Sequence, residues 1–223
     1  MKCATKNIVK VVTVLALAVI VGIVFFTPSQ TEPGLGIGDI IEFGNYEWRV
    51  IDAQNGKVLV LCEYIVKGPV EFHGSGGSAR WENSQTRQYL NSEFLDSFSP
   101  YERSKIVETY VVNADNPWFD TYGGRNTMDY IFLLSIEEVV LYFGDSGQLE
   151  NRPHQRSVAI DDEYNYSRVA QSLDNSNAIF WWLRSIGITD RTAAFVGRDG
   201  INVMGMFAGY TYGGIRPAMW LKQ

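Results

Sequence analysis

The sequence predicts an α+β fold in which antiparallel hairpins occupy both ends of the folded domain and two to three short helices lie between them. Three observations predict this class. Residues 39–62 and 193–206 are rich in strand-forming side chains, and each stretch contains an Asx-Gly pair typical of hairpin turns. Two short segments between them begin with helix-capping residues. Strands followed by helices and then by strands are typical of an α+β domain.

The N-terminal hairpin has the strongest local signal. Residues 39–43 and 46–52 carry the isoleucine, valine and aromatic side chains that favour strands. Asn55 and Gly56 both tolerate the positive φ that a type I′ turn requires. We therefore expect residues 58–62 to return antiparallel to the strand before them.

A second turn is predicted near the C-terminus. Asp199 and Gly200 form an Asx-Gly pair like Asn55-Gly56. They separate two apolar stretches, residues 193–197 and 201–206. We expect these stretches to form a hairpin closed by the Asp-Gly pair.

The middle of the chain is predicted to be helical. Ser99 and Ser135 each precede a glutamate at the third helical position, which is the pattern of a capping box. Gly144 is expected to end the second of these helices. A third helix is expected over residues 84–95.

Two long segments, residues 63–80 and 145–177, show no clear hydrophobic period. Segments of this length without regular structure usually carry function or are disordered. The first contains the glycine- and serine-rich run 74–78, which we interpret as a flexible loop because it lacks the order of a nucleophile elbow.

The N-terminus predicts export. Residues 11–26 contain no charge and follow three lysines, and a spanning helix needs roughly 20 apolar residues. We expect residues 1–26 to be a cytoplasmic tip and signal-anchor transmembrane helix, residues 27–37 a linker, and residues 38–223 a single extracellular domain. The protein would be single-pass in the cell membrane, or secreted if the segment is cleaved as a signal peptide.

Charge excludes one class of partner. Residues 27–223 contain 16 basic and 25 acidic residues, a formal net charge of −9. Such a domain is repelled by nucleic acid, so we expect no nucleic-acid partner. Cys3 and Cys62, the two cysteines of the chain, would lie on opposite sides of the membrane and could not pair.

No set of residues suffices for catalysis. The chain has only two histidines, His73 and His154, and their spacing does not indicate a metal site. Calcium is the one cofactor that we leave open, because several oxygen-bearing side chains share one loop. Its weak candidate ligands are Asn113, Asp115 and Asp120.

Ligand contacts are expected from exposed aromatic residues and from polar residues near the late turns, where side chains can vary without disturbing a core. These candidates are Asp190, Arg191, Arg198, Asp199, Asn202, Tyr210, Tyr212, Trp118 and Tyr122. A second set is expected to be structural, with the arginines tethering loops rather than clamping an anion. It consists of Trp181, Trp182, Arg184, Arg216 and Trp220.

Five ordered blocks resemble a bacterial family of exported domains of unknown function. They are residues 39–51, 81–94, 127–135, 181–185 (Trp-Trp-Leu-Arg-Ser) and 214–221, which contains Gly-Ile-Arg-Pro-Ala. The last two blocks resemble, more distantly, the C-type-lectin-like fold of formylglycine-generating enzymes. That resemblance implies a ligand-facing surface on residues 187–212. It also implies that formylglycine generation is absent, since this activity needs a cysteine pair.

The sequence therefore predicts a membrane-anchored extracellular binding or interaction module, without catalysis, whose ligand is a glycan or a protein. Two alternatives remain open. One is a degenerate or metal-dependent enzyme of the formylglycine-generating fold, and the other is a structural component of an envelope complex.

Overall fold

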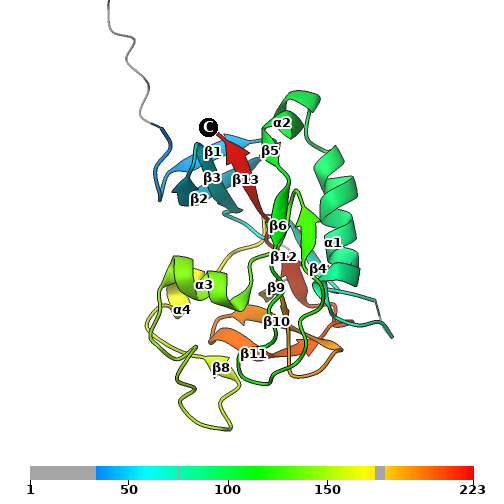
Figure 1. Cartoon of the computed structure of the whole chain (residues 1–223), viewed down its shortest axis with the longest axis vertical. Helices are drawn as coiled ribbons and strands as arrows, with labels where there is room; N and C mark the ends of the chain where they lie inside the picture. The colour runs from blue at the N-terminus through cyan, green and yellow to red at the C-terminus, as the bar shows by residue number, and fades with distance from the viewer. Residues whose placement is uncertain (1–33, 75, 174–178) are drawn as a thin grey trace, which may run out of the picture. The chain divides into compact units, whose positions relative to one another are not determined.

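The computed structural model describes residues 34–74, 76–173 and 179–223 (Figure 1). The predicted transmembrane segment, residues 1–26, lies outside this part of the chain, as do residues 27–33 of the predicted linker. Within the described residues, no helix is long and apolar enough to cross a membrane. Gly34–Gln223 forms one compact unit.

The first sheet has five strands in the order β1-β2-β3-β13-β5. Their bounds are β1 Ile40–Phe43, β2 Tyr46–Gln54, β3 Lys57–Cys62, β5 Ile106–Val107 and β13 Ala218–Lys222. All neighbours in this sheet are antiparallel. The C-terminal strand therefore lies between strands from the start and the middle of the domain.

The second sheet has six strands in the order β4-β12-β9-β10-β11-β8. Their bounds are β4 Lys67–Val70, β8 Ala159–Ile160, β9 Phe180–Ile186, β10 Thr192–Gly197, β11 Gly200–Phe207 and β12 Gly213–Ile215. Only β12 and β9 run parallel; the other neighbours are antiparallel. A separate two-stranded sheet pairs β6, Thr109–Val111, with β7, Thr127–Asp129.

The helices are few and short, as the sequence predicts. They are the 3-10 turn η1 Trp81–Asn83, α1 Gln85–Tyr89, the π-helical turn η2 Leu90–Phe94, α2 Pro100–Lys105, α3 Ile136–Phe143 and α4 Asn165–Arg168. Both predicted capping boxes are present, at Ser99 and at Ser135. Gly144 ends α3 with a φ of 124°. The predicted helix over residues 84–95 is a continuous helical stretch capped by Ser84, but its second half is π-helical.

The two predicted turns differ in outcome. Asn55 and Gly56 have φ angles of 52° and 70°, which confirms the type I′ turn. The Asp199-Gly200 prediction is wrong in register, because Arg198 and Asp199 form the tip and Gly200 pairs with Gly197. The glycine is needed for a different reason: its φ is 97°, and a Cβ atom there would lie 2.0 Å from the Ile160 carbonyl oxygen of β8.

The predicted unpatterned segments contain short elements that only distant pairing reveals. Residues 63–80 include β4, and residues 145–177 include β8 and α4. Each of these strands has only two to four residues and lies at an edge of the second sheet. A strand this short cannot display a hydrophobic period.

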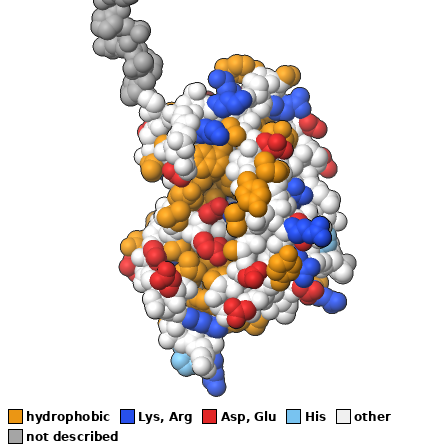
Figure 2. Space-filling model, in the orientation of Figure 1, with side chains coloured by type: hydrophobic (Ala, Val, Ile, Leu, Met, Phe, Trp, Pro, Cys, Tyr) orange, Lys and Arg blue, Asp and Glu red, His pale blue; other side chains and the backbone are white. Residues whose placement is uncertain are grey.

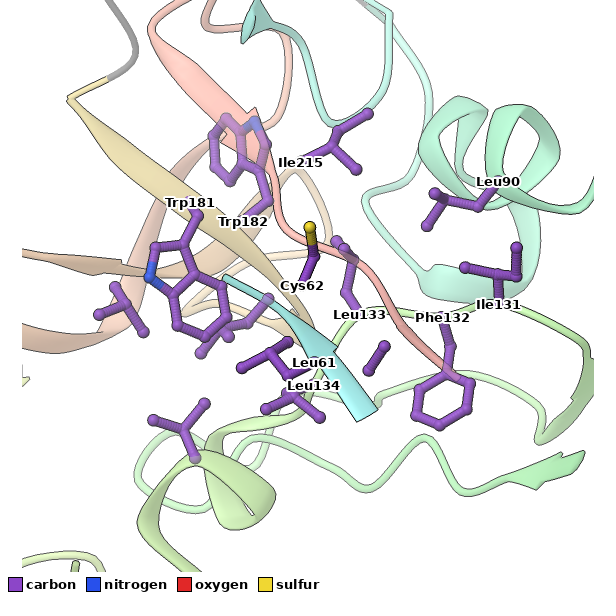
Figure 3. Close-up of a cluster of buried hydrophobic side chains, with 14 of the residues drawn as sticks. Leu61, Cys62, Leu90, Ile131, Phe132, Leu133, Leu134, Trp181, Trp182 and Ile215 are labelled. Carbon is purple, nitrogen blue, oxygen red and sulfur yellow. The ribbon is translucent and has the colours of Figure 1, made fainter. Parts of the chain in front are cut away.

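The core lies where the two sheets meet. The chain passes from the first sheet to the second between β3 and β4, and returns between β12 and β13, so the two crossings are neighbours. Cys62 N donates to Pro217 O at 2.9 Å, and Val66 N donates to Ile215 O at 2.8 Å. Every residue of β9 is buried, and Figure 3 shows Trp181 and Trp182 pointing to opposite faces of that strand. β9 is thus covered on both sides.

Candidate functional site

A groove of about 1100 Å³ lies beside the β10–β11 hairpin. It gathers four of the predicted ligand-binding residues: Arg198, Asp199, Asn202 and Tyr210. Arg198 and Asp199 form the tip of the hairpin, Asn202 lies on β11, and Tyr210 follows that strand. We call this feature the hairpin groove.

Aromatic side chains line the hairpin groove between the polar ones. Phe180 and Trp181 come from β9, and Phe195 comes from β10. The ring centroids of Phe180 and Phe195 are 4.4 Å apart, with their planes tilted by 41°. An apolar lining with a few converging polar groups is the usual composition of a ligand site. Sequence reasoning missed these phenylalanines, because nothing in a strand pattern distinguishes a groove-lining ring from a core ring.

Arg198, Asp199 and Asn202 contribute polar side-chain groups to the hairpin groove. Asn202 Oδ1 accepts from Gly205 N at 2.8 Å, which holds the amide in place. Within the described ranges, its Nδ2 donors and the side chains of Arg198 and Asp199 make no hydrogen bond or ion pair. Both signs of charge and an oriented amide therefore converge on one groove.

Tyr210 and Tyr212 form an aromatic pair at the rim. Their ring centroids are 5.0 Å apart, and their exposed fractions are 44% and 49%. The backbone carbonyl of Tyr212 accepts from Ile179 N at 3.1 Å, so this segment is tied to the start of β9. Half-exposed tyrosines combine an apolar face with a hydroxyl group, which suits contact with a polar ligand.

Three other predicted contacts lie at the opposite end of β10. Asp190 and Arg191 form the β9–β10 turn, where their carbonyl oxygens accept from Ala79 N at 2.6 Å and Ala208 N at 2.9 Å. The ring of Tyr122 lies 5.3 Å from the guanidinium of Arg80 in the loop before η1. Six strand residues span roughly 20 Å, so these residues lie far from Arg198 and Asp199 at the hairpin tip, and they do not line the hairpin groove.

Trp118 belongs to neither group. Its Nε1 donates to Leu149 O at 2.9 Å, and the guanidinium of Arg152 lies 5.1 Å from its ring. These contacts join two loops, and the side chain is partly buried. We therefore assign Trp118 to loop packing.

The calcium candidates are used within their own loop. Asp115 Oδ1 accepts from Gly123 N at 2.9 Å, and Asn113 Nδ2 donates to Arg125 O at 2.7 Å. Asp120 has a φ of 53°, and its side chain is exposed at a turn. Asn113 Oδ1 is the one buried side-chain oxygen of the three residues that lacks a partner, whereas calcium takes six to eight oxygens. The described residues contain no group of three or more His, Cys, Asp or Glu side chains placed to hold a metal.

The signature arginines are both buried and both bind carbonyl oxygens. Arg184 Nη1 donates to Leu133 O at 2.7 Å, and its Nη2 donates to Glu138 Oε1 at 2.7 Å. Arg216 Nε donates to Cys62 O at 2.8 Å. Trp181 and Trp182 are buried, and Trp220 is partly buried against the core.

A second concave feature lies between β2 and α3, where the surface in Figure 2 is hollowed. This pocket has a volume of about 490 Å³, and Arg49, Glu63 and Arg216 contribute its charged groups. We call it the arginine pocket. Sequence reasoning missed Arg49 and Glu63, although each is a charged residue beside an otherwise apolar strand run, which is a usable signal.

Thiol chemistry has no support in the geometry. Cys62, the only cysteine of residues 34–223, is fully buried, and burial raises the pKa of its thiol to about 11. A buried thiol of this pKa is a poor nucleophile. His154 Nδ1 accepts from Arg156 N at 3.0 Å within a surface loop, where it contacts no nucleophile.

The fold is a mixed α and β domain with mostly antiparallel sheets, and a groove lies beside its β10–β11 hairpin. Residues 55–223 match the family described as Domain of unknown function (DUF6273), and the chain belongs to that family. Searches of curated proteins and of solved structures returned no match to this chain.

Proposed function

We propose that this protein is a membrane-anchored extracellular binding module that recognises a carbohydrate in the hairpin groove and catalyses no reaction. One observation carries the proposal: four residues chosen from sequence as ligand contacts line a single groove of about 1100 Å³ with aromatic rings between them. Sugars present apolar faces ringed by hydroxyl groups. The Tyr210–Tyr212 pair offers rings for such faces, and Asn202 and Asp199 offer hydrogen-bond partners for the hydroxyls.

The resemblance to the C-type-lectin-like fold is consistent with this proposal. It implies a ligand surface between the Trp-Arg and Gly-Ile-Arg blocks, and half of the lining residues of the hairpin groove come from that interval. The blocks themselves are neighbours, since Gly213 and Gly214 of β12 pair with Phe180 and Trp181 of β9. Exposure outside the cell rests on residues 1–26, in which the lysines lie on the N-terminal side of the apolar run.

The test is binding of the full-length chain, purified in a mild detergent, to a broad glycan array. Tyr210→Ala and Arg198→Ala should each weaken binding of any recognised glycan by at least about tenfold, because truncating a central contact costs upwards of about 1.4 kcal/mol. Two matched controls should retain binding. Arg191→Ala removes an exposed arginine at the other end of β10, and Tyr110→Ala removes an exposed tyrosine of β6.

Absence of glycan binding by folded protein would overturn the carbohydrate proposal. Equal losses in the control variants would show that the hairpin groove is not the site. Circular dichroism of every variant establishes that loss of binding is not loss of fold.

An envelope-complex component is a second possibility that one observation favours. The outer face of the β6–β7 sheet exposes four apolar or aromatic side chains, and hydrophobic side chains are visible at the surface over β6 in Figure 2. These residues are Tyr110, Val112, Met128 and Tyr130. Photo-crosslinking from positions 110 and 128 in intact cells tests whether this face contacts another protein. Discrete adducts would support an envelope complex, and their absence would reject it in favour of the binding module.

A further inference from the structure

The arginine pocket holds a buried positive charge that the described residues do not pair. Arg216 is 3% exposed, and its Nε and Nη1 donate to the carbonyl oxygens of Cys62 and Arg168. Its Nη2 has no hydrogen-bond partner among the described residues, and Arg216 makes no ion pair with them. Burial of a charge is costly. It lowers the pKa of the guanidinium to about 10, although the nearby Glu63 carboxylate acts in the opposite direction, so the group stays charged at neutral pH.

The pocket contains two guanidinium groups and one carboxylate. Arg49 Nε lies 2.5 Å from Glu63 Oε1, which pairs those two charges. Two further acids, Asp52 and Glu47, do not line the pocket: Asp52 accepts a hydrogen bond from Tyr142 Oη at 3.3 Å, and Glu47 is hydrogen-bonded to Tyr64. The lining therefore carries one more positive charge than negative charge. The planar guanidinium of arginine can donate two parallel hydrogen bonds to the two oxygens of a carboxylate, which the ammonium group of lysine cannot do.

The arginine pocket and the hairpin groove share one lining segment. Val169, Ala170 and Gln171 line both of them, so a ligand lying across this segment would contact both. The segment is held to the β3–β4 connection, because Ile65 N donates to Gln171 O at 2.8 Å. An extended molecule could thus place sugar rings in the groove and a charged group in the pocket.

We infer that the ligand of the hairpin groove is an acidic carbohydrate whose carboxylate binds Arg216 and Arg49 in the arginine pocket. The inference rests on the proposed carbohydrate function and narrows its ligand class. The acidic character of the whole domain does not oppose it. At physiological ionic strength charges separated by more than about 8 Å are screened. The arginines in the pocket therefore determine whether an anion binds there.

The experiment uses a glycan array in which each uronic-acid oligosaccharide is paired with its carboxyl-reduced, neutral counterpart. The full-length chain in detergent should prefer the acidic member by at least about tenfold, the value of one charge-assisted contact. Free glucuronate, titrated by isothermal calorimetry, measures the arginine pocket without the groove.

Two substitutions should shift acidic-glycan affinity in opposite directions. Arg49→Gln should weaken it about tenfold, because a partly exposed guanidinium is lost. Glu63→Gln should strengthen it about threefold or more, because the carboxylate that competes for both arginines becomes neutral. If the Arg49–Glu63 ion pair were only structural, Glu63→Gln would not increase the affinity for the acidic glycan. Arg103→Gln is the control, since Arg103 of α2 forms an exposed ion pair with Asp96 and neither residue lines the pocket.

The outcomes separate the two proposals. Equal binding of acidic and neutral members, or indifference to both pocket substitutions, would overturn the acidic-ligand inference and leave the carbohydrate module standing. Absence of all glycan binding together with no glucuronate binding would overturn both. Glucuronate binding that Glu63→Gln strengthens, without oligosaccharide binding, would support the pocket and reject the groove.

Discussion

Arg184 illustrates how one buried side chain can hold several segments in place. It donates to the carbonyl oxygens of Leu133 and Val112 and to the carboxylate of Glu138 at the start of α3. A planar fork of donors can satisfy such scattered acceptors at once, whereas a lysine could not. Arg184 therefore ties β9 to α3, to the segment after β6 and to the connection between β7 and α3.

Arg184→Met should therefore lower the free energy of unfolding by about 3 kcal/mol, the cost of breaking a buried ion pair and stranding its partners. Chemical denaturation with urea measures this. Arg103→Met removes an ion pair whose side chains are 41% and 70% exposed, and it should cost less than about 1 kcal/mol. Similar losses for both variants would show that Arg184 is not a tether.

At the scale of the elements, two positions with positive φ require glycine for different physical reasons. A Cβ atom at Gly56 would meet nothing within 4 Å, so the demand there is conformational alone. At Gly200 a Cβ atom would lie 2.0 Å from the carbonyl oxygen of Ile160. The first position closes a hairpin, and the second lets β8 approach β11.

Gly56→Ala should cost about 1 kcal/mol, the usual penalty for a left-handed non-glycine residue. Gly200→Ala should cost more, at least about 2 kcal/mol, because the β8–β11 pairing must also shift. Urea denaturation of the two variants gives the comparison. Amide exchange localises the second effect: faster exchange confined to β8 and β11 supports the explanation, and equal costs at both glycines would contradict it.

Elements determined by neighbouring residues could be predicted from the sequence, and those determined by distant pairing could not. The capping boxes at Ser99 and Ser135 and the Asn55-Gly56 turn each involve contacts within four residues. By contrast, Trp182 Nε1 donates to Val70 O, 112 residues away, and Arg216 Nε donates to Cys62 O, 154 residues away. Such contacts set the strand order and the edge strands β4 and β8.

The candidate site follows the same rule. Arg198, Asp199, Asn202 and Tyr210 could be chosen because polar and aromatic residues near a turn are accessible. That they share a groove, while Asp190 and Arg191 lie at the other end of β10, depends on strand register. The arginine pocket draws its charges from β2, the residue after β3 and the β12–β13 connection, so no local pattern could assemble it.

For the whole molecule, the use of the Asx side chains in loop hydrogen bonds predicts stability without calcium. Asn116 Oδ1 accepts from Trp118 N and Phe119 N, and its Nδ2 donates to the carbonyl oxygens of Ile186 and Val203. Excess chelator should therefore change the melting temperature by less than about 1 °C, since no ligand of the folded state is removed. Differential scanning calorimetry with chelator and with added calcium measures it. A fall in the melting temperature that added calcium reverses would contradict this prediction and support a calcium site.

The last prediction concerns the orientation of the chain in the membrane. Lys2, Lys6 and Lys10 precede the apolar run, and cytoplasmic flanks carry an excess of lysine and arginine. Alkaline phosphatase folds to an active form only outside the cytoplasm, so a C-terminal fusion to the full chain should be active. Replacing all three lysines by glutamate should at least halve that activity, roughly the effect of removing the orienting charge, whereas replacing them by arginine should preserve it. The mass of the purified chain then distinguishes an anchor from a cleaved signal peptide, and an inactive parent fusion would reject the extracellular location on which the proposed binding function depends.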